Sequence, residues 1–237
     1  MSVDDIILEK ASKSFASFMA LRSVDLSVQR GQFVLLAGAN GAGKSTLLRL
    51  AAGVSRPNSG RVLIAGEDPQ RNSTARAAIG LLSHHTLLYD DLSAEENLSF
   101  FAQLYGLPNG TQRVEEVLEE VGLLEHRRRR LRGFSRGMRQ RLALARATLH
   151  RPAVLLLDEP FTGLDQPACA ALSQRLLQVK SQGHTCMMVT HRVGEAAGLA
   201  DRLVVLRRGR ICHDQPWQGS SQELVETCAP FLGTTTH

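Results

Sequence analysis

The sequence predicts an α/β fold with a mixed, mainly parallel sheet, antiparallel strands near the N-terminus and an inserted helical subdomain. Short runs with alternating or continuous apolar residues, typical of strands, occupy the first third of the chain and return after Pro152. Between them, residues 93–149 carry a helical pattern. Because strands that alternate with helices favour parallel sheets with crossover helices, we expect two halves of one sheet on either side of the helical block.

The N-terminal third contains the first group of strands and one early helix. Alternating polarity predicts a strand at residues 24–28, and a continuous apolar run predicts another at 33–37. Residues 47–52 follow a glycine-rich turn and are predicted as a helix. Further strands are expected at residues 6–8, 61–65 and 79–82.

A capping signal marks the start of the helical block. Ser93 is followed three residues later by Glu96, which matches a capping box, and the helix is expected to end near Gly106 and Pro108. Two more helices are predicted, at residues 111–121 and 135–149. The strands that follow are expected at residues 154–158, 185–190 and 203–206, with helical stretches between them.

The composition is that of an ordinary globular domain. Hydrophobic residues make up 43% and charged residues 22% of the 237 residues, which is enough for one domain with a sizeable core. We expect residues 1–84 and about 151–237 to form the core of a single domain, 1–237. Residues of about 85–150 are expected to form its helical subdomain.

The charge of the chain limits the partners that it is expected to bind. The net charge of +5 is small and comes mostly from arginine. Such an excess fits binding of a polyanion such as a nucleotide, or work beside an anionic membrane face. The densest run is at residues 127–130 with Arg132. Since no aromatic residues are interleaved, we interpret it as a solvated or lipid-facing surface and expect no nucleic-acid partner.

The cysteines and the apolar runs indicate where the chain works. The four cysteines show no CxxC pairing and no secretory leader precedes them, so we expect reduced thiols in a cytoplasmic protein. No apolar run approaches the roughly 20 residues that span a bilayer. If the protein serves a membrane process, we expect another chain to supply the membrane-spanning part.

A glycine-rich segment between a predicted strand and a predicted helix carries the first chemical signal. It matches GxxxxGK[ST] in the context that the motif requires. Glycines let backbone N–H groups turn inward around phosphates, and the following helix adds the positive end of its dipole. Lys44 would reach the β- and γ-phosphates of a nucleotide, and the Ser45 hydroxyl would ligate Mg²⁺. The predicted phosphate loop consists of Gly38, Ala39, Asn40, Gly41, Ala42, Gly43, Lys44, Ser45 and Thr46.

Two carboxylates stand at the end of the apolar strand predicted at residues 154–158. Ligands of open α/β sheets sit beyond the carboxyl ends of the strands, so Asp158 and Glu159 are expected to face the nucleotide. We predict that Asp158 holds Mg²⁺, directly or through water, and that Glu159 orients and deprotonates the attacking water. The alternative is a charged loop that only caps the strand, and the phosphate loop argues against it.

Three further segments decide among the families that carry a phosphate loop. Residues 134–141 read FSRGMRQR and are followed by LALARA and by the strand that ends in Asp158. Residues 162–165 read TGLD, and Thr190 is followed by His191. In this order and spacing they resemble the LSGGQ signature, the D-loop and the switch histidine of ABC ATPases, along nearly the whole chain. The resemblance implies a P-loop NTPase core that hydrolyses ATP with Mg²⁺.

The resemblance also implies roles for individual residues. Two such domains close head-to-tail around two ATP molecules, with Ser135 and Gly137 of the signature on the nucleotide of the second subunit. Ser135 precedes a predicted helix, where its hydroxyl and backbone N–H groups suit a γ-phosphate. His191 would bond the γ-phosphate, and Asp165 would communicate across the interface. Phe15, in the segment SKSF, stands where the family places an aromatic ring on adenine.

Two parts of the sequence depart from the family pattern. Arg136 replaces the usual central glycine of the signature, and Met138 the usual glutamine. Arg136 either adds a positive charge near the partner's phosphate or points into solvent. His84 stands where members carry a catalytic glutamine, and we predict that its imidazole replaces that side chain in part, since it offers one hydrogen bond. Neighbouring side chains of an extended chain point opposite ways, so His84 and His85 are not expected to share a metal.

The segment at residues 79–89, IGLLSHHTLLY, resembles the ATP-binding subunit of the haem exporter of cytochrome c maturation. A histidine in place of the glutamine and an FSRGM-like signature are both similar to that group. The resemblance implies a peripheral subunit at the cytoplasmic face of the cell membrane, bound to membrane permease subunits and to a second ATP-binding subunit as a homodimer. A permease helix would dock at residues 86–106, although Leu98, Phe101 and Leu104 could instead face the subdomain's own core.

Other functions compete with haem export. ATPases of drug or lipid exporters have a similar size. A soluble ABC ATPase acting on ribosomes or DNA usually joins two ATPase units or carries long coiled-coil insertions, and this sequence has neither. Glu159 argues against a nucleotide switch without hydrolysis. Since selectivity belongs mainly to the membrane chains, the transported molecule and its direction stay open.

Overall fold

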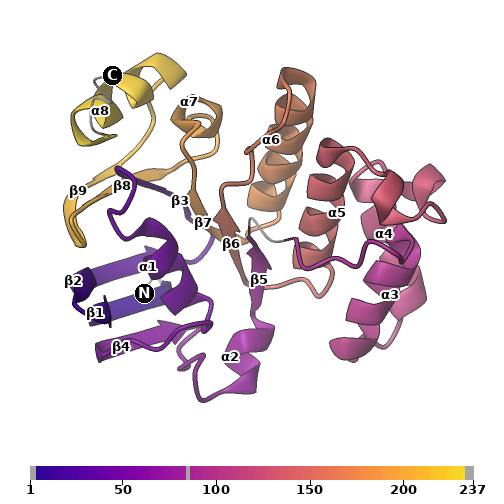
Figure 1. Ribbon diagram of the computed structural model, residues 1–237, viewed down its shortest axis with the longest axis horizontal. Helices are drawn as coiled ribbons and strands as arrows, with labels where there is room; N and C mark the ends of the chain where they lie inside the picture. The colour runs from indigo at the N-terminus through magenta and orange to yellow at the C-terminus, as the bar shows by residue number, and fades with distance from the viewer. Residues whose placement is uncertain (1–3, 84–85, 233–237) are drawn as a thin grey trace.

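The computed structural model describes residues 4–83 and 86–232, and a six-stranded sheet lies at the centre of this part of the chain (Figure 1). Its strands are, in spatial order, β5 (Ile79–Leu82), β6 (Val154–Asp158), β7 (Thr185–Val189), β3 (Phe33–Ala37), β8 (Arg202–Arg207) and β9 (Arg210–Pro216). The first five run parallel, and β9 pairs antiparallel with β8. Strands β3, β6 and β7 are buried at every position, as expected of parallel strands covered on both faces.

A second, three-stranded sheet contains the N-terminal strands. It consists, in spatial order, of β2 (Phe18–Gln29), β1 (Asp4–Phe15) and β4 (Ser59–Ile64), and each neighbouring pair is antiparallel. Burial largely alternates along the second half of β2, because one face of this sheet packs on the core and the other faces solvent. The predicted mixed sheet with N-terminal antiparallel strands is therefore confirmed, although β1 extends well beyond the predicted residues 6–8.

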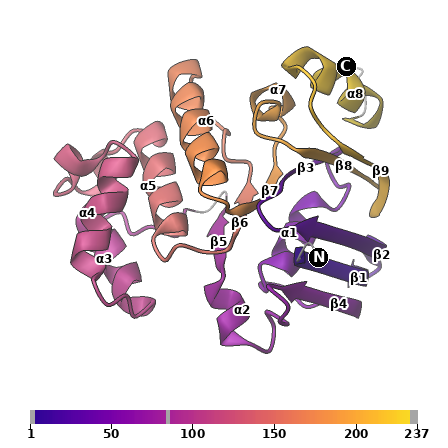
Figure 2. The same cartoon turned by 180° about the vertical axis from the view of Figure 1, so that it is seen from behind.

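Helices cover both faces of the large sheet (Figures 1 and 2). Helix α1 (Lys44–Ala51) lies between the two sheets, and its leucines join strands of both sheets in one apolar cluster. On the opposite face, α6 (Gln166–Ser181), α7 (Val193–Ala196) and α8 (Ser221–Leu232) join β3, β6, β7 and β8 in a second cluster. The short helix α2 (Ser73–Ala77) contacts β4 and β5.

The helical block stands to one side of the sheet, with a third apolar cluster of its own. It contains α3 (Ala94–Leu104), α4 (Gly110–Glu120), α5 (Arg136–Thr148) and the short 3₁₀ turns η1 (Leu124–His126) and η2 (Leu131–Gly133). Helix α5 is apolar on two sides, since its residues divide between the helical cluster and the cluster under the sheet. It therefore connects the block to the sheet. The division into core and subdomain at residues 85 and 150 stays a prediction.

The start of α3 confirms the predicted capping box. The Ser93 hydroxyl accepts a hydrogen bond from the Glu96 backbone N–H at 3.2 Å, and the Glu96 carboxylate accepts one from the Ser93 N–H at 2.7 Å. Hydrogen bonding of the ionised carboxylate to the Ser93 backbone N–H, and secondly to the Ser93 hydroxyl, holds the pKa of Glu96 below its usual value. Two orphan N–H groups of the helix start are satisfied in this way.

Two elements near the C-terminus were not predicted. Strand β9 is an edge strand that is mostly exposed, so its sequence carries no continuous apolar run. Helix α8 contains Pro230, a residue that normally argues against a helix interior. Within the described ranges, no helix combines the length and the apolar character needed to cross a bilayer.

Candidate functional site

The predicted phosphate loop connects the carboxyl end of β3 to the start of α1. Gly38 and Gly43 have φ values of 142° and 110°, which other residues rarely adopt. A Cβ atom on Gly38 would lie 2.3 Å from the Leu206 carbonyl oxygen, and one on Gly43 would lie 2.5 Å from that of Ala20. Glycine is therefore required at both positions for the loop to pass this close to its neighbours.

Lys44 is buried inside this loop. Its Nζ donates hydrogen bonds to the carbonyl oxygens of Gly38 at 2.7 Å and of Ala39 at 3.0 Å. Burial lowers the pKa of Lys44, and the nearby carboxylates of Glu159 and Asp158 oppose this shift. The sequence thus folds so that an ammonium group lies within the concave side of the loop, where a phosphate would replace the carbonyl contacts.

The Ser45 hydroxyl meets the end of β6. Its Oγ donates to Oδ1 of Asp158 at 3.2 Å, across 113 positions of the sequence. A hydroxyl and a carboxylate are hard oxygen ligands of the kind that Mg²⁺ takes together with phosphates and water. Ser45 and Asp158 therefore fit the predicted magnesium site.

Glu159 and His191 form a pair at the ends of the neighbouring strands β6 and β7. His191 Nε2 lies 3.1 Å from Glu159 Oε1, and the His191 backbone N–H donates to Oε2 at 3.0 Å. Glu159 has a φ of 54°, a left-handed conformation that costs free energy for a residue with a side chain. A bond from the Glu159 N–H to the Val189 carbonyl, at 2.8 Å, holds this conformation.

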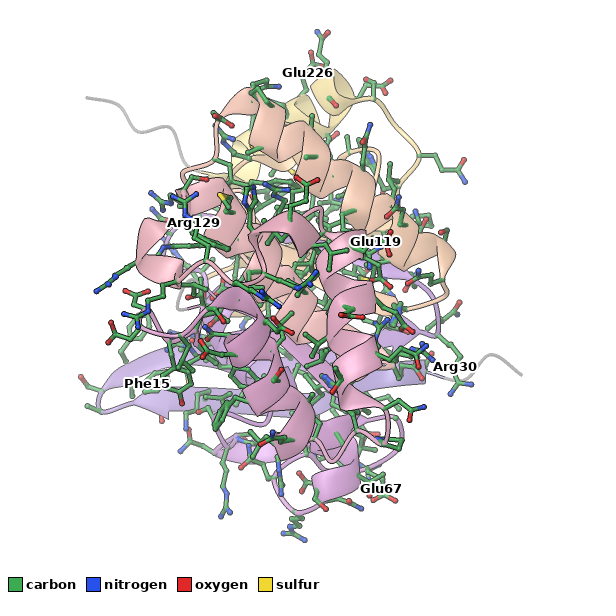
Figure 3. All side chains as sticks on the ribbon, turned by 90° about the vertical axis from the view of Figure 1, so that its right-hand side faces the viewer. Phe15, Arg30, Glu67, Glu119, Arg129 and Glu226 are labelled. Carbon is green, nitrogen blue, oxygen red and sulfur yellow. The ribbon has the colours of Figure 1, made fainter. Side chains whose placement is uncertain are left out.

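A pocket of about 220 Å³ brings these groups together. Phe18 lines this pocket, whereas the predicted adenine-stacking residue Phe15 does not. Phe15 lies at the end of β1, where its ring is 48% exposed and Lys13 Nζ stands 5.3 Å from its centre (Figure 3). The residues around the pocket are Phe18, Ala20, Asn40, Gly41, Gly43, Lys44, Ser45, Thr46, Glu159 and His191.

The signature segment forms a separate surface. Ser135 is the N-cap of α5, and its hydroxyl accepts a bond from the Met138 N–H at 3.2 Å. Ser135 and Gly137 line a cavity of about 490 Å³ together with Gly163 and Asp165 of the predicted D-loop. None of these residues lines the phosphate-loop pocket. The structure thus places signature and D-loop side by side and apart from the chain's own phosphate loop.

Arg136 lies against the D-loop. A Cβ atom on Gly163 would come within 2.0 Å of the Arg136 guanidinium carbon, so the guanidinium packs directly over this glycine and would have to move if residue 163 carried a side chain. Asp165 is the N-cap of α6 and accepts a bond from the Ala168 N–H at 3.0 Å. The sequence left two positions open for Arg136, near the partner's phosphate or in solvent. In this structure its guanidinium packs over Gly163 of the D-loop.

Some residues of the site are missed by motif reasoning. Phe18 contributes an aromatic ring three positions after Phe15, and the hairpin between β1 and β2 pairs the two residues. Gln140, in the signature helix, donates from Nε2 to the Pro160 carbonyl at 2.8 Å, next to the catalytic candidate Glu159. His84 and His85 lie outside the described residues.

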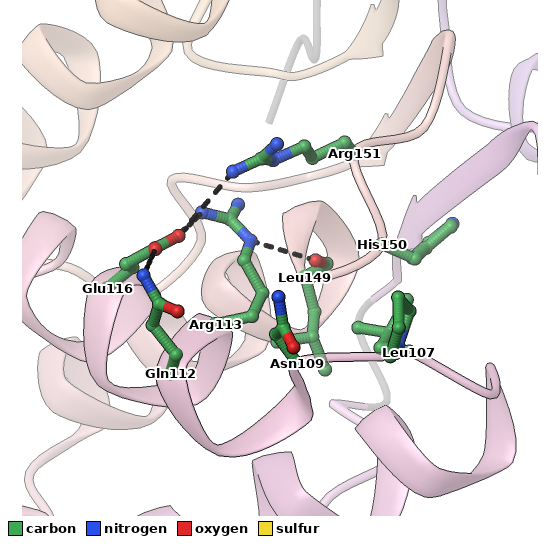
Figure 4. A pocket seen from close by; sticks show the side chains of 9 residues that line it. Leu107, Asn109, Gln112, Arg113, Glu116, Leu149, His150 and Arg151 are labelled. Carbon is green, nitrogen blue, oxygen red and sulfur yellow. Dashed lines mark hydrogen bonds and ion pairs between the residues drawn. The ribbon is translucent and has the colours of Figure 1, made fainter.

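A further cavity, of about 300 Å³, lies between α4 and the connection from α5 to β6 (Figure 4). The polar side chains that line it form hydrogen bonds and ion pairs with neighbouring lining residues. Arg113 Nε donates to the Leu149 carbonyl at 3.0 Å, and Glu116 receives ion pairs from Arg113 at 3.1 Å and Arg151 at 3.5 Å. These bonds satisfy a carbonyl at the end of α5, so we interpret the lining as a structural clamp.

Known proteins resemble this chain over most of its length. A family profile described as ABC transporter matches residues 21–162, more than half of the chain. A sulfate/thiosulfate import ATP-binding protein CysA from Thermosynechococcus vestitus is 41% identical over 209 residues, which are 87% of this chain and 62% of that protein. The chain therefore spans less than two thirds of that relative's length. The daunorubicin resistance ATP-binding protein DrrA3 from Streptomyces coeruleorubidus is 37% identical over 222 residues, 92% of this chain and 69% of that protein.

Solved structures agree with the fold. The structure of an ATP binding subunit of an ABC transporter matches with a TM-score of 0.83 at 29% identity, and the match covers 94% of this chain and 99% of that one. The mixed α/β architecture, with a mainly parallel sheet and a helical block, is shared with it.

Proposed function

The chain belongs to the ABC transporter family, and we propose that it is an ATP-hydrolysing subunit that drives a separate membrane permease. The observation that carries the proposal is the convergence of Lys44, Ser45, Asp158, Glu159 and His191 around one loop. Cation, hydroxyl and carboxylates are the groups that phosphoryl transfer with Mg²⁺ requires.

The proposed mechanism assigns one task to each group. The loop N–H groups and Lys44 hold the phosphates, and Ser45 with Asp158 holds Mg²⁺, which neutralises developing charge when bound. Glu159 positions the attacking water and accepts its proton. His191 turns from the Glu159 carboxylate to the γ-phosphate, which leaves one carboxylate oxygen free for the water.

We propose that two copies of the chain form the working unit. Ser135, Gly137 and Asp165 line a surface that the chain's own nucleotide pocket does not include. The N-terminus of α5 offers backbone N–H groups to a phosphate there. A second subunit would place its nucleotide against this surface, in the head-to-tail arrangement that the family resemblance implies.

The proposed permease contact is an exposed apolar surface that we define as Leu87, Tyr89, Phe100 and Leu104. These side chains are between 43% and 68% exposed, and the Tyr89 and Phe100 rings meet edge to face at 5.5 Å. Leu98 and Phe101 lie on α3 together with Phe100 and Leu104, but they are buried in the helical block. Helix α3 therefore has one side buried in the helical block and one apolar side exposed. The exposed side fits an apolar helix of the membrane chain, at the cytoplasmic side of the membrane.

For the cargo we propose haem, as part of cytochrome c maturation. Support comes from the sequence at residues 79–89 and from the FSRGM signature. A drug exporter is the second candidate, because the relative named for daunorubicin resistance is 37% identical over 92% of this chain. Another relative, 41% identical, is named for sulfate/thiosulfate import. Sequence identity in this subunit therefore does not identify the transported molecule.

Co-purification of the native chain from detergent-solubilised membranes tests the proposal. We expect a membrane permease to accompany the chain and Mg²⁺-dependent ATP hydrolysis to accompany both. Permeases of cytochrome c maturation in the sample would support haem as the transported molecule. The permease of a drug exporter would overturn the assignment of haem. Recovery of the chain only with ribosomes or DNA would overturn the transport proposal altogether.

A further inference from the structure

The turn at residues 161–165 stands between the catalytic and the interface parts of the molecule. It begins two residues after Glu159 and ends at Asp165, the N-cap of α6. The Thr162 hydroxyl lies 3.5 Å from Glu159 Oε2. A displacement of this turn would therefore reach the catalytic carboxylate at one end and the interface aspartate at the other.

Arg192 reaches this turn from the loop between β7 and α7. It follows His191, and its guanidinium NH1 donates to the Leu164 carbonyl at 3.2 Å and also contacts the Cys169 sulfur at the start of α6. Its backbone N–H donates to the Thr190 hydroxyl at 3.0 Å. Because Thr190 is buried, this bond fixes the backbone of Arg192, while its guanidinium binds the turn.

Arg136 also contacts the turn, because its guanidinium packs over Gly163. Arg136 comes from the helical block, and Arg192 comes from the loop between β7 and α7, next to His191. Arg192 follows His191 directly in the chain, so its bond to the Leu164 carbonyl connects the turn to the His191 segment, which the Arg136 contact does not do. A side chain that can donate at the end of a long stem is needed to bridge from residue 192 to Leu164.

We propose that Arg192 is a positioning residue that ties the His191 segment to the turn at residues 161–165. The inference rests on the proposed ATPase function. Through this tie, Asp165 at the subunit interface keeps its position relative to the backbone of the His191 segment while the His191 ring moves during hydrolysis. Arg192 touches neither the phosphate loop nor the nucleotide pocket, so it acts on the reaction through the turn and not through ATP binding.

Steady-state ATPase kinetics of the full chain test this role. We expect Arg192→Ala to lower kcat about tenfold while KM for ATP stays within about twofold, because small misplacement of catalytic groups affects the chemical step. Arg192→Lys keeps a donor on a flexible stem and is expected to recover at least half of kcat. Arg71→Ala removes a guanidinium on the outer surface that pairs with Asp68, and serves as the matched control.

Three results would overturn the inference. They are an unchanged kcat in Arg192→Ala, a rise in KM that accounts for the whole loss, and a fall in melting temperature with kcat per folded molecule unchanged. Glu159→Gln is measured in the same assay to separate this inference from the proposed function. If Glu159→Gln abolishes turnover and Arg192→Ala does not reduce it, only the role of Arg192 is wrong. If the wild-type chain shows no turnover, the proposed function itself fails.

Discussion

His191 holds both oxygens of the Glu159 carboxylate, one through its ring at 3.1 Å and the other through its backbone N–H at 3.0 Å. The two residues follow neighbouring parallel strands, so the sheet itself brings them together. In this arrangement the ring lies against one oxygen of the carboxylate that is proposed to activate the attacking water. In the proposed mechanism the ring leaves this carboxylate, and the γ-phosphate is the group expected to draw it away.

Glu159→Gln is expected to abolish turnover and to trap an ATP-bound dimer. The amide still accepts a hydrogen bond but cannot take the proton of the water, and the loss of a general base typically costs 10²–10⁴-fold. Phosphate release measures turnover, and size-exclusion chromatography with ATP measures the dimer. Glu119→Gln changes an exposed carboxylate on α4 and should leave both unchanged. Normal hydrolysis by Glu159→Gln would remove Glu159 from its role.

Lys44→Ala is expected to weaken nucleotide binding itself. Hydrogen bonds to a charged group contribute about 1.5–3 kcal/mol, which corresponds to a loss of affinity of about 10- to 100-fold. Calorimetric titration with ADP separates this effect from hydrolysis. Lys10→Ala, at an exposed position on β1, is the control. Unchanged ADP affinity in Lys44→Ala would contradict the assignment.

Two phenylalanines of the first hairpin, Phe15 and Phe18, are candidates for the ring that stacks on adenine. Phe15 remains the predicted stacking ring by family resemblance, but Phe18 is the one that lines the phosphate-loop pocket. Stacking of a base on an aromatic ring contributes about 1–3 kcal/mol, so Phe15→Ala should weaken ATP binding about tenfold or more and Phe15→Tyr should not. If Phe18→Ala weakens binding and Phe15→Ala leaves it unchanged, the stacking role belongs to Phe18.

The central strands of the fold are readable from the sequence because burial leaves a direct mark on it. Strands β3 and β6 are buried at every position and appear as continuous apolar runs, up to Asp158 at the end of β6. Strand β9 is an exposed edge with no such run. Helix α8 presents one buried side to the sheet, and its Pro230 contradicts the usual helix pattern. Only contacts made in the folded chain determine these two elements.

The same distinction applies to the site. Lys44 and Glu159 belong to short linear motifs, in which spacing alone indicates the chemistry. Gly209 is different: its N–H donates to the Ala42 carbonyl at 2.9 Å and its carbonyl accepts from the Arg22 N–H at 2.8 Å, so it connects the phosphate loop to β2. Arg192 likewise acts through a contact 28 positions away. Neither residue lies in a motif, and both depend on how the strands meet.

His150 provides a pH-dependent contribution to stability in the helical block. Its ring stacks on Tyr105 at 4.0 Å, and its Nε2 lies 3.0 Å from the Ile79 carbonyl oxygen. Burial lowers the pKa of His150; the bond to Ile79 opposes this, and the Arg146 charge adds to it. The unfolded chain, with a histidine pKa of about 6.5, therefore binds more protons than the folded one just below that pH.

The free energy of unfolding should therefore be highest above about pH 6.5 and should fall as the pH drops through the window between the unfolded and folded pKa of His150. In His150→Gln the amide can still donate to the Ile79 carbonyl but does not titrate. We expect its melting temperature to fall less between pH 7.5 and 5.5 than that of the wild type. His126→Gln removes an exposed imidazole and should follow the wild type. Parallel curves for wild type and His150→Gln would show that protonation of His150 is not coupled to unfolding.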